Sequence, residues 1–410
     1  MTRPDVSTPA VTAVPQAPRD VAPAPGTVPD GPPGLRPVRA ALLLPLSGPS
    51  AALGAAMFNA AQLALFDLAE ANFTLLPFDT QGTPDGAAEA ARQAVAQNAH
   101  VVLGPIVSAE VKAAAPVVRE ARISMLSFST DRGAAGDGVF VMGFLPRQQV
   151  DRVLGYARGQ GLTRFAAIAP DTEYGRTVAD QFTQAAARLG GAVTRVEFYR
   201  GGAEPADAVK RVARYDARTR ALRQHKAQLS ARGDAESLNE LRRLDRADTL
   251  GEVDFDAVLL PDDGARLRNV AALLPFYDVD IRRVRVLGTM LWDDPGLGAE
   301  PALVGGWYPA PSPDGRADFL AAYARAFGAK PPNIASLAYD ATALVAVLAR
   351  QQADYGVAAL TNANGFAGVD GIFRLLPDGT SERGLAVMEV TRGGPRVIDP
   401  APETFQAQVY

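Results

Sequence analysis

From Val38 onward the chain alternates short apolar runs with Ala-rich amphipathic stretches, and this alternation limits the fold more than any other feature. The apolar runs cover residues 40–46, 73–78, 101–103, 124–128, 165–169, 193–199, 255–260 and 284–287. Helical patterns lie between them, at residues 53–70, 86–98, 109–121, 147–160, 175–189 and 264–275. Strands and helices that alternate in this way predict α/β architecture, with helices on both faces of mostly parallel sheets.

The length and composition exclude several classes of function. A chain of 410 residues is too long for one ordinary domain and fits two to three. Its formal net charge of -4 gives no reason to expect a nucleic-acid partner. It has no cysteine and two histidines, His100 and His225, which excludes disulfides, thiol nucleophiles and metal sites built from cysteine or several histidines. We therefore expect no metal and no other cofactor.

Residues 1–37 are rich in proline and alanine and contain no aromatic residue. Such a segment favours polyproline II over helix or sheet, so we expect a disordered tether. No signal-peptide pattern precedes it, and no apolar run approaches the roughly 20 residues of a membrane span. We therefore expect no membrane span in this chain, while a signal peptide or lipidated cysteine before residue 1 stays open.

Residues 206–250 break the rhythm because they are highly charged. Residues 207–250 hold eleven Arg and Lys against seven Asp and Glu. Helical patterns cover about 208–229 and 236–244, separated by residues 230–234. Two interpretations stay open: a solvated helical hairpin inserted in a loop, or a protruding arm that binds a partner. In the second case the partner-binding candidates are Arg214, Arg218, Arg223 and Arg242.

Catalytic motifs are hard to find in this sequence. No Gly-x-Gly-x-x-Gly or Walker pattern follows a strand, and the serine of Leu46-Ser-Gly-Pro49 lacks the flanking glycines of a nucleophile elbow. The carboxylate pairs Asp262-Asp263 and Asp293-Asp294 are more typical of helix caps than of a glycosidase. We therefore expect a protein that is not an enzyme.

Small hydroxyl side chains follow several strands. Ser47, Ser108, Ser129 and Thr130 lie on strand-to-helix turns, and Asp131 comes next. Hydroxyls and free N–H groups at helix N-termini can hold a polar ligand beyond the carboxyl ends of parallel strands. Each hydroxyl taken alone can be a helix cap, and for Ser47 and Ser108 this is the favoured interpretation. Several caps that converge on one cleft would form a ligand site, and the sequence leaves that convergence open.

Six motifs follow one another between residue 38 and about residue 395. They are Leu43-Leu-Pro-Leu-Ser-Gly-Pro49, Val102-Leu-Gly-Pro-Ile-Val-Ser108, Ile123-Ser-Met-Leu-Ser-Phe-Ser-Thr130, Ile168-Ala-Pro-Asp-Thr-Glu-Tyr-Gly175, Phe255-Asp-Ala-Val-Leu-Leu260 and Leu337-Ala-Tyr-Asp-Ala341. Their order and spacing resemble type I periplasmic binding proteins of the leucine/isoleucine/valine-binding kind. The resemblance implies two α/β lobes, joined by three crossovers, that close on a ligand.

By this resemblance we place the crossovers near residues 145, 309 and 368. Lobe 1 would then comprise residues 38–145 and 310–367, and lobe 2 residues 146–309 and 368–400. The inserted hairpin at 206–250 would belong to lobe 2.

The family's amino-acid site can be carried over residue by residue. Ser108 corresponds to the serine that binds the ligand carboxylate, and Tyr174 to the aromatic residue that lines the cleft from lobe 2. Leu53 replaces an aromatic cover, and Asp131 replaces a threonine, so a carboxylate would stand beside the ligand carboxylate and repel it. The further cleft residues that we expect are Ser47, Ser129, Thr130, Asp262, Met290 and Trp292.

The acidic partner of the ligand ammonium is missing from its expected place. That glutamate falls at about Met290 or its neighbours Thr289 and Leu291, none of which is acidic. A buried ammonium without its partner costs roughly 3–5 kcal/mol, so we expect weak binding of zwitterionic amino acids. A slip of the alignment by two or three residues would let Asp293 or Asp294 supply the acid.

A subgroup fits more closely. Ser127-Phe-Ser-Thr-Asp-Arg132, Val141-Met-Gly-Phe-Leu-Pro146, Gly288-Thr-Met-Leu-Trp-Asp-Asp294 and Asn364-Gly-Phe-Ala-Gly-Val-Asp-Gly-Ile-Phe373 look like the penicillin-binding protein activators. The charged hairpin also looks like that group. These envelope lipoproteins stimulate a peptidoglycan synthase, which implies a periplasmic location and an outer-membrane lipid anchor in the precursor. The anchoring cysteine itself is absent from this sequence.

Our main hypothesis is therefore a non-enzymatic activator of a penicillin-binding protein that acts through protein contact. The alternative is the solute-binding protein of an ABC importer, with a permease as its partner and an amino acid or another small polar molecule as its ligand. An enzyme is the third and least supported class.

Overall fold

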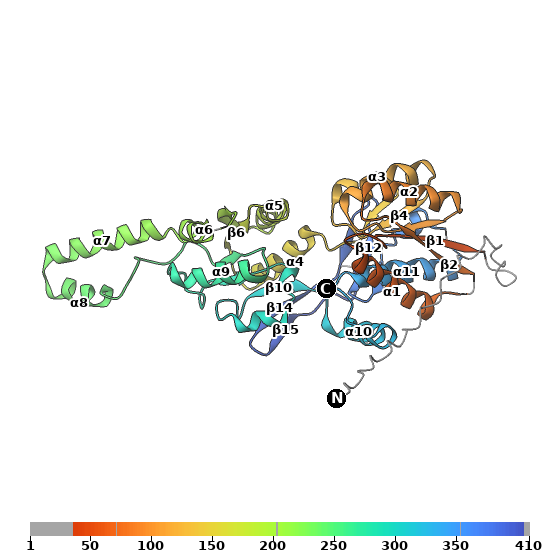
Figure 1. The fold of residues 1–410 in the computed structure, drawn as a ribbon. Helices are drawn as coiled ribbons and strands as arrows, with labels where there is room; N and C mark the ends of the chain where they lie inside the picture. Colours follow the sequence, from red (N-terminus) through yellow and green to blue (C-terminus); the bar gives the residue numbers. More distant parts are fainter. Residues whose placement is uncertain (1–35, 71, 202–203, 353, 406–410) are drawn as a thin grey trace, which may run out of the picture.

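Two α/β lobes and a helical arm make up the described chain (Figure 1). The computed structural model describes residues 36–70, 72–201, 204–352 and 354–405, so nearly all of the expected tether lies outside the described residues. The predicted fold class, two lobes with mostly parallel sheets flanked by helices, is confirmed.

Lobe 1 is built on a five-stranded parallel sheet with the order β2-β1-β3-β4-β5. Its strands are β1 (Val38–Leu44), β2 (Phe73–Asp79), β3 (Val101–Leu103), β4 (Ser124–Ser127) and β5 (Val139–Val141). Alternate residues of β1 enter different cores, because side chains alternate across a strand. Leu42 and Leu44 belong to the core under α1 and α11, whereas Leu43 packs with α2 and α3 on the other face.

The helices of lobe 1 are α1 (Ala51–Leu68), α2 (Pro84–Ala96), α3 (Ser108–Glu120), α10 (Pro313–Phe327), α11 (Ala335–Arg350) and α12 (Val357–Leu360). Among the described helices, α1 alone is long and apolar enough to cross a membrane by length and composition. It lies against α11 and buries small residues such as Ala60 and Ala64 in the lobe 1 core. A soluble core helix passes the same test, so α1 is weak support for a membrane span.

Lobe 2 is built on a seven-stranded sheet with the order β15-β14-β10-β9-β8-β6-β7, in which β14 and β15 are antiparallel and the rest parallel. Its strands are β6 (Arg164–Pro170), β7 (Ala192–Tyr199), β8 (Ala257–Leu259), β9 (Arg285–Leu287), β10 (Trp307–Ala310), β14 (Ala386–Thr391) and β15 (Gly394–Asp399). Helices α4 (Pro146–Gly159) and α5 (Glu173–Arg188) cover one face, and α6 (Glu204–Val212) and α9 (Gly264–Phe276) cover the other.

The chain passes between the lobes three times. The first passage lies between β5 and α4, and the second between β10 and α10. The third was expected near residue 368 but comes after β13, at residues 384–385. The reason is a separate three-stranded sheet of β11 (Phe366–Gly368), β12 (Gly371–Leu375) and β13 (Ser381–Arg383), whose Phe373 and Leu375 pack into the lobe 1 core.

The charged insertion also begins later than expected. Residues 204–212 form α6, which buries Ala208, Val209 and Val212 in the lobe 2 core. Arg214 then takes a left-handed conformation, with φ of 51°, and turns the chain outward. The arm proper is α7 (Tyr215–Arg232) and α8 (Ala235–Leu244), which extend away from lobe 2 in Figure 1.

Candidate functional site

A cleft of about 870 Å³ lies between the lobes. Lobe 1 contributes the turns that follow β3 and β4, and lobe 2 contributes the first turns of α5. Five of the predicted site residues line it together: Ser108, Ser129, Thr130, Asp131 and Tyr174. The carboxyl ends of parallel strands therefore form the lobe 1 wall, as expected for an open α/β sheet.

Asp131 is held by an internal ion pair on the lobe 1 wall. Its Oδ2 accepts a hydrogen bond from the Ser108 hydroxyl and lies 2.7 Å from Lys112 Nζ. Its Oδ1 accepts the Gly133 N–H at 2.8 Å. The hydrogen bonds from Lys112 and Ser108 lower the pKa of Asp131 to about 2, so its carboxylate is ionised at neutral pH. The hydroxyl that was expected to bind a ligand carboxylate thus already binds a carboxylate of the protein.

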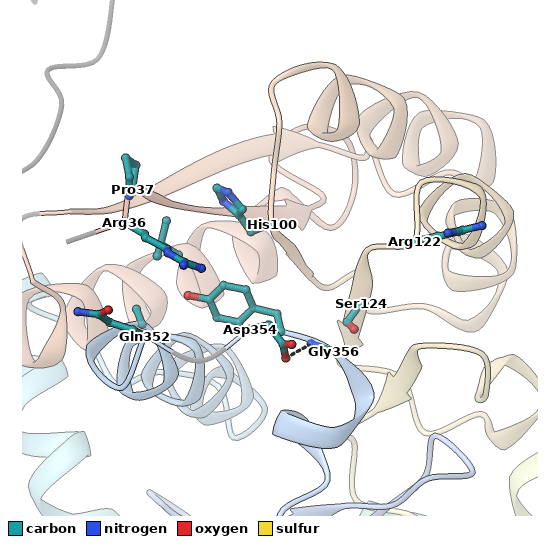
Figure 2. Close-up of a pocket in the computed structure, with 11 residues that line it drawn as sticks. Arg36, Pro37, His100, Arg122, Ser124, Gln352, Asp354 and Gly356 are labelled. Atoms are coloured by element: carbon teal, nitrogen blue, oxygen red, sulfur yellow. Dashed lines mark hydrogen bonds between the residues drawn. The ribbon is translucent and has the colours of Figure 1, made fainter. Parts of the chain in front are cut away.

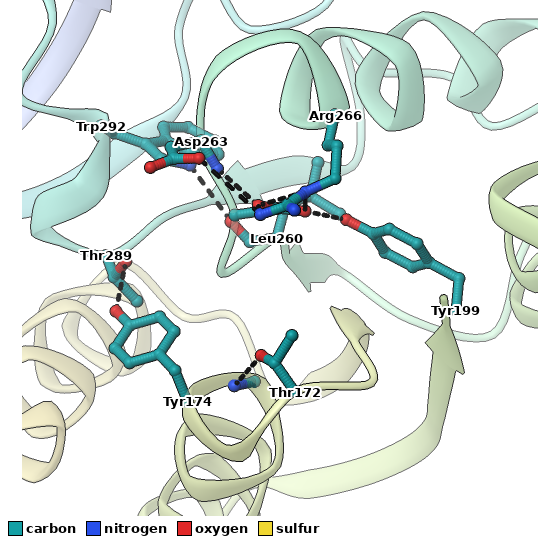
Figure 3. Close-up of polar contacts among 10 residues, drawn as sticks. Thr172, Tyr174, Tyr199, Leu260, Asp263, Arg266, Thr289 and Trp292 are labelled. Carbon is teal, nitrogen blue, oxygen red and sulfur yellow. Dashed lines mark hydrogen bonds and ion pairs between the residues drawn. The ribbon is translucent and has the colours of Figure 1, made fainter. Parts of the chain in front are cut away.

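Tyr174 extends from the start of α5 toward Thr289, which precedes the short 3-10 helix η2 (Met290–Trp292) (Figure 3). Thr172 caps this helix, because its Oγ1 accepts the Gly175 N–H at 3.1 Å. The Tyr174 hydroxyl donates to Thr289 Oγ1 at 3.0 Å, and burial raises the pKa of the phenol to about 12. The tyrosine is therefore neutral and fixed, which suits a wall residue in a binding cleft.

Asp262 does not line the cleft, because other groups of the protein bind its carboxylate. The carboxylate accepts hydrogen bonds from the Tyr199 hydroxyl and from the Asp263 N–H at 2.9 Å. Arg266 donates to it through Nε at 3.0 Å and Nη2 at 2.8 Å. Burial raises the pKa of Tyr199. These hydrogen bonds hold Asp262 at the start of α9 and leave its carboxylate no free acceptor for a ligand.

Three other predicted site residues also lie outside the cleft lining. Ser47 is exposed on the loop after β1, where its N–H donates to Asp79 Oδ1 at 3.2 Å. Trp292 is fully buried in the lobe 2 core, and its indole N–H donates to Leu260 O at 3.1 Å. Met290 packs against the cores of both lobes, and its N–H donates to Gln149 Oε1 at 2.9 Å, which places it at the hinge.

The two aspartates that could have supplied the missing acid are engaged elsewhere. Asp293 Oδ2 lies 3.7 Å from Arg316 Nη1, and Asp294 Oδ1 accepts the Gly296 N–H at 2.8 Å as the cap of η3 (Pro295–Ala299). Neither lines the cleft. A different carboxylate does: Glu173, at the start of α5, has no hydrogen bond or ion pair of its side chain within the described chain.

Sequence reasoning missed several charged residues of the cleft. Lys112, Arg132 and Arg147 bring positive charge to its lining, and Glu173 adds a negative charge. Lys112 could have been predicted from the sequence, because it lies four residues after Ser108 and therefore on the same face of α3. Glu173 directly precedes Tyr174, a residue that was predicted. Arg132 likewise directly follows Asp131, which was predicted. Arg147 carried no such signal, since only the tertiary structure brings it into the cleft.

A buried arginine joins two of the passages between the lobes. Arg383 on β13 donates to Met142 O through Nε at 3.2 Å and Nη2 at 3.1 Å. Its Nη1 lies 3.6 Å from Asp340 Oδ2 on α11, and neither side chain is exposed. The guanidinium also lies over the rings of Phe144 and Phe373, 4.7 and 5.1 Å from their centroids. Burial raises the pKa of Asp340 to about 7.

A second ion group continues this network to lobe 2. Arg316 on α10 places Nε 3.1 Å from Asp370 Oδ1 and Nη1 3.7 Å from Asp293 on the η2–η3 loop. The Ser336 hydroxyl donates to Asp370. Burial raises the pKa of Asp293. The charges around the hinge therefore come from both lobes, buried in lobe 1 and half-buried at Asp293 in lobe 2.

A second cavity, of about 470 Å³, lies at the opposite, amino ends of the lobe 1 strands (Figure 2). His100 Nδ1 accepts the Arg39 N–H at 3.0 Å, and burial lowers the histidine's pKa. Figure 2 shows Arg122 pointing away from Arg36 and His100. The two guanidinium groups do not converge on one ligand position. Among the described residues, no group of three or more His, Asp or Glu side chains could hold a metal ion.

A model of the periplasmic binding protein family matches residues 37–395. The chain belongs to this family. An uncharacterized protein of Rickettsia prowazekii is 22% identical over 249 residues, which is 61% of this chain, and the chain spans only 59% of that relative's length.

Solved structures agree with the family in fold. A Rhodospirillum rubrum protein, whose name proposes a branched-chain amino acid ABC transporter, matches with a TM-score of 0.71 and 21% identity, over 88% of this chain and 100% of that one. A branched-chain amino acid transporter substrate binding protein of Streptococcus pneumoniae, in complex with isoleucine, has a TM-score of 0.55 and 18% identity, over 89% and 100%. These names describe transport proteins, and the activator subgroup stays a prediction.

Proposed function

We propose that this protein is a periplasmic solute-binding protein of an ABC importer that holds a small polar solute between its lobes. The observation that carries the proposal is the 870 Å³ cleft, which residues of both lobes line. A ligand held between two lobes favours the closed arrangement by its contacts to both, which is how such proteins couple binding to a change of shape. The importer, which was our alternative hypothesis, thereby replaces the activator as the leading one.

The charges in the cleft indicate which solutes fit. Glu173 offers an unpaired carboxylate to an amine, while Arg132 and Arg147 offer guanidinium groups to an anion. Arg147 is only loosely paired, 3.5 Å from Asp151. The Ser108 hydroxyl is occupied by Asp131. Amino acids and other small polar solutes therefore remain the proposed ligands. Their charged groups would be bound by Glu173, Arg132 and Arg147 and not by the residues that the family resemblance implied.

Calorimetric titration and thermal-shift screening test this proposal with a panel of amino acids, amine-free carboxylates and neutral polyols. A ligand at 100 times its dissociation constant should stabilise the protein by about 2.7 kcal/mol. Glu173→Gln should weaken an amine-bearing ligand at least about tenfold and leave an amine-free one unchanged. Glu120→Gln, an exposed carboxylate at the far end of α3, is the matched control. A panel without any binder would contradict the proposal.

A second candidate function is activation of a peptidoglycan synthase through protein contact. The specific observation in its favour is the projecting arm of α7 and α8. Adding the purified protein to a glycan-polymerisation assay with a penicillin-binding protein of the same organism tests it. Stimulation that does not require a solute would favour this candidate over the importer.

A further inference from the structure

The arm, defined as residues 215–250, contributes little to the core of the protein. Of the eighteen residues of α7, only Leu222 and Leu229 are buried, and α8 buries only Ser237. Figure 1 shows both helices extending beyond lobe 2, on the side away from lobe 1. The stability of the lobes therefore does not explain why these helices are present.

The base of the arm is nevertheless firmly attached. Arg218 donates to Gly251 O at 2.7 Å and to Asp278 O at 3.1 Å, and its own carbonyl accepts the Leu250 N–H at 3.2 Å. Farther out, His225 Nε2 lies 2.9 Å from Glu240 Oε1 and joins α7 to α8. A surface that is held in shape before binding loses little conformational entropy when a partner arrives.

The unpaired charge on the arm is mainly positive, although the whole chain carries a formal net charge of -4. Within the described chain, seven cationic side chains of the arm have no carboxylate partner: Arg220, Arg223, Lys226, Arg232, Arg242, Arg243 and Arg246. Four carboxylates of the arm have no cationic partner: Asp234, Glu236, Asp245 and Asp248. The arm therefore carries a positive excess that nothing else in the described chain neutralises.

Two of the four predicted partner-binding arginines instead attach the base of the arm to lobe 2. Arg218 is bound there as described, and Arg214 Nη1 lies 3.4 Å from Asp254. Arg223 and Arg242 are exposed, and Arg242 donates to Asn239 on its own helix. The cations available to a partner thus begin with Arg220, two residues beyond the anchoring Arg218.

We propose that the arm docks against an acidic surface of a partner protein. Complementary charge accelerates encounter and selects the partner, and an exposed, pre-shaped cationic helix pair supplies it. A lipid surface is disfavoured, because membrane-lying helices need a broad apolar face. The exposed face of the arm offers a single large apolar side chain, Leu238, at 47% exposure. This inference does not depend on the solute, so it can fail while the importer proposal stands.

Site-specific photo-crosslinking of the full chain in its own host tests the inference. A benzophenone amino acid replaces Gln224 or Gln228 on the exposed side of α7, and Gln97 of lobe 1 serves as the control position. We expect one protein to be crosslinked from both arm positions but not from Gln97, through a peptide rich in Asp and Glu. Crosslinks to the same protein from all three positions, or to none from the arm, would overturn the inference.

Charge reversal then tests the chemistry of the contact. Arg220→Glu with Arg223→Glu should reduce the crosslink yield about tenfold or more. Reversal of two unpaired lobe cations, Arg325→Glu with Arg392→Glu, should leave the yield unchanged, and thermal melts check that both variants fold. An unchanged yield in the arm variant would overturn the inference. So would sedimentation of the wild type with anionic phosphatidylglycerol vesicles that the arm reversal abolishes, because that result assigns the arm to a membrane.

Discussion

Replacing Arg383 with methionine should destabilise the protein by about 3–5 kcal/mol, the usual effect of removing one partner of a buried ion pair. The side chain is fully buried, donates twice to Met142 O, and faces Asp340 at 3.6 Å. Methionine keeps most of the apolar volume between Phe144 and Phe373 but offers no donor to the carbonyl and no charge to Asp340. Urea unfolding followed by circular dichroism at neutral pH measures the loss.

Two further results are expected when the same measurement is repeated over pH and with a second substitution. The deficit of Arg383→Met should grow as pH rises above 7, because an unpaired Asp340 must then stay protonated at a cost of up to about 1.4 kcal/mol per pH unit. Adding Asp340→Asn removes the cost of keeping that carboxyl group protonated, keeps an acceptor for the Val369 N–H, and should recover at least about 2 kcal/mol.

Arg374→Met on the neighbouring strand provides the matched control. Its ion pair with Glu382 is partly exposed, so its loss should cost less than about 1 kcal/mol. A deficit for Arg383→Met no larger than that of the control would refute the view that the buried pair holds the hinge together. A double variant no more stable than the single one would refute the electrostatic explanation.

Two predictions concern pH and packing. Asp340 should lower the free energy of unfolding as pH rises from 3.8 toward 7, because it ionises in the unfolded chain while burial keeps it protonated in the folded one up to about 7. Asp340→Asn should therefore make a pH series of urea midpoints rise more, or fall less, over this range than in the wild type, and an unchanged slope would contradict the assignment. Gly288→Ala should lower the melting temperature, because an added Cβ would lie 2.1 Å from the Trp292 ring and cost about 1–3 kcal/mol, whereas Gly155→Ala, which meets no atom within 4 Å on α4, should not.

The sequence predicted the architecture well because periodicity reports burial directly. Strands such as β1 and β6 are continuous apolar runs, and the Ala-rich helix patterns between them match α1 to α5 closely. The predicted element boundaries that proved wrong are those where the local sequence pattern does not show which core a helix packs against. Residues 204–212 and 215–232 look like one charged helical stretch in the sequence. In the structure, Ala208 and Val212 pack into the lobe 2 core, whereas no residue of α7 belongs to that core.

The candidate site divides in the same way. Ser108, Asp131 and Tyr174 could be predicted because they follow strands or begin helices, where the chain leaves a parallel sheet at its ligand-binding edge. The sequence did not reveal that Asp131 would take the Ser108 hydroxyl and the Lys112 ammonium for itself, or that Asp262 would be enclosed by Tyr199 and Arg266. The pattern of apolar and polar residues is a local property of the sequence, so it determines which segments form the sheets and which helices cover them. The pairing of one charge with another depends on distances across loops and lobes, and only the folded chain decides those.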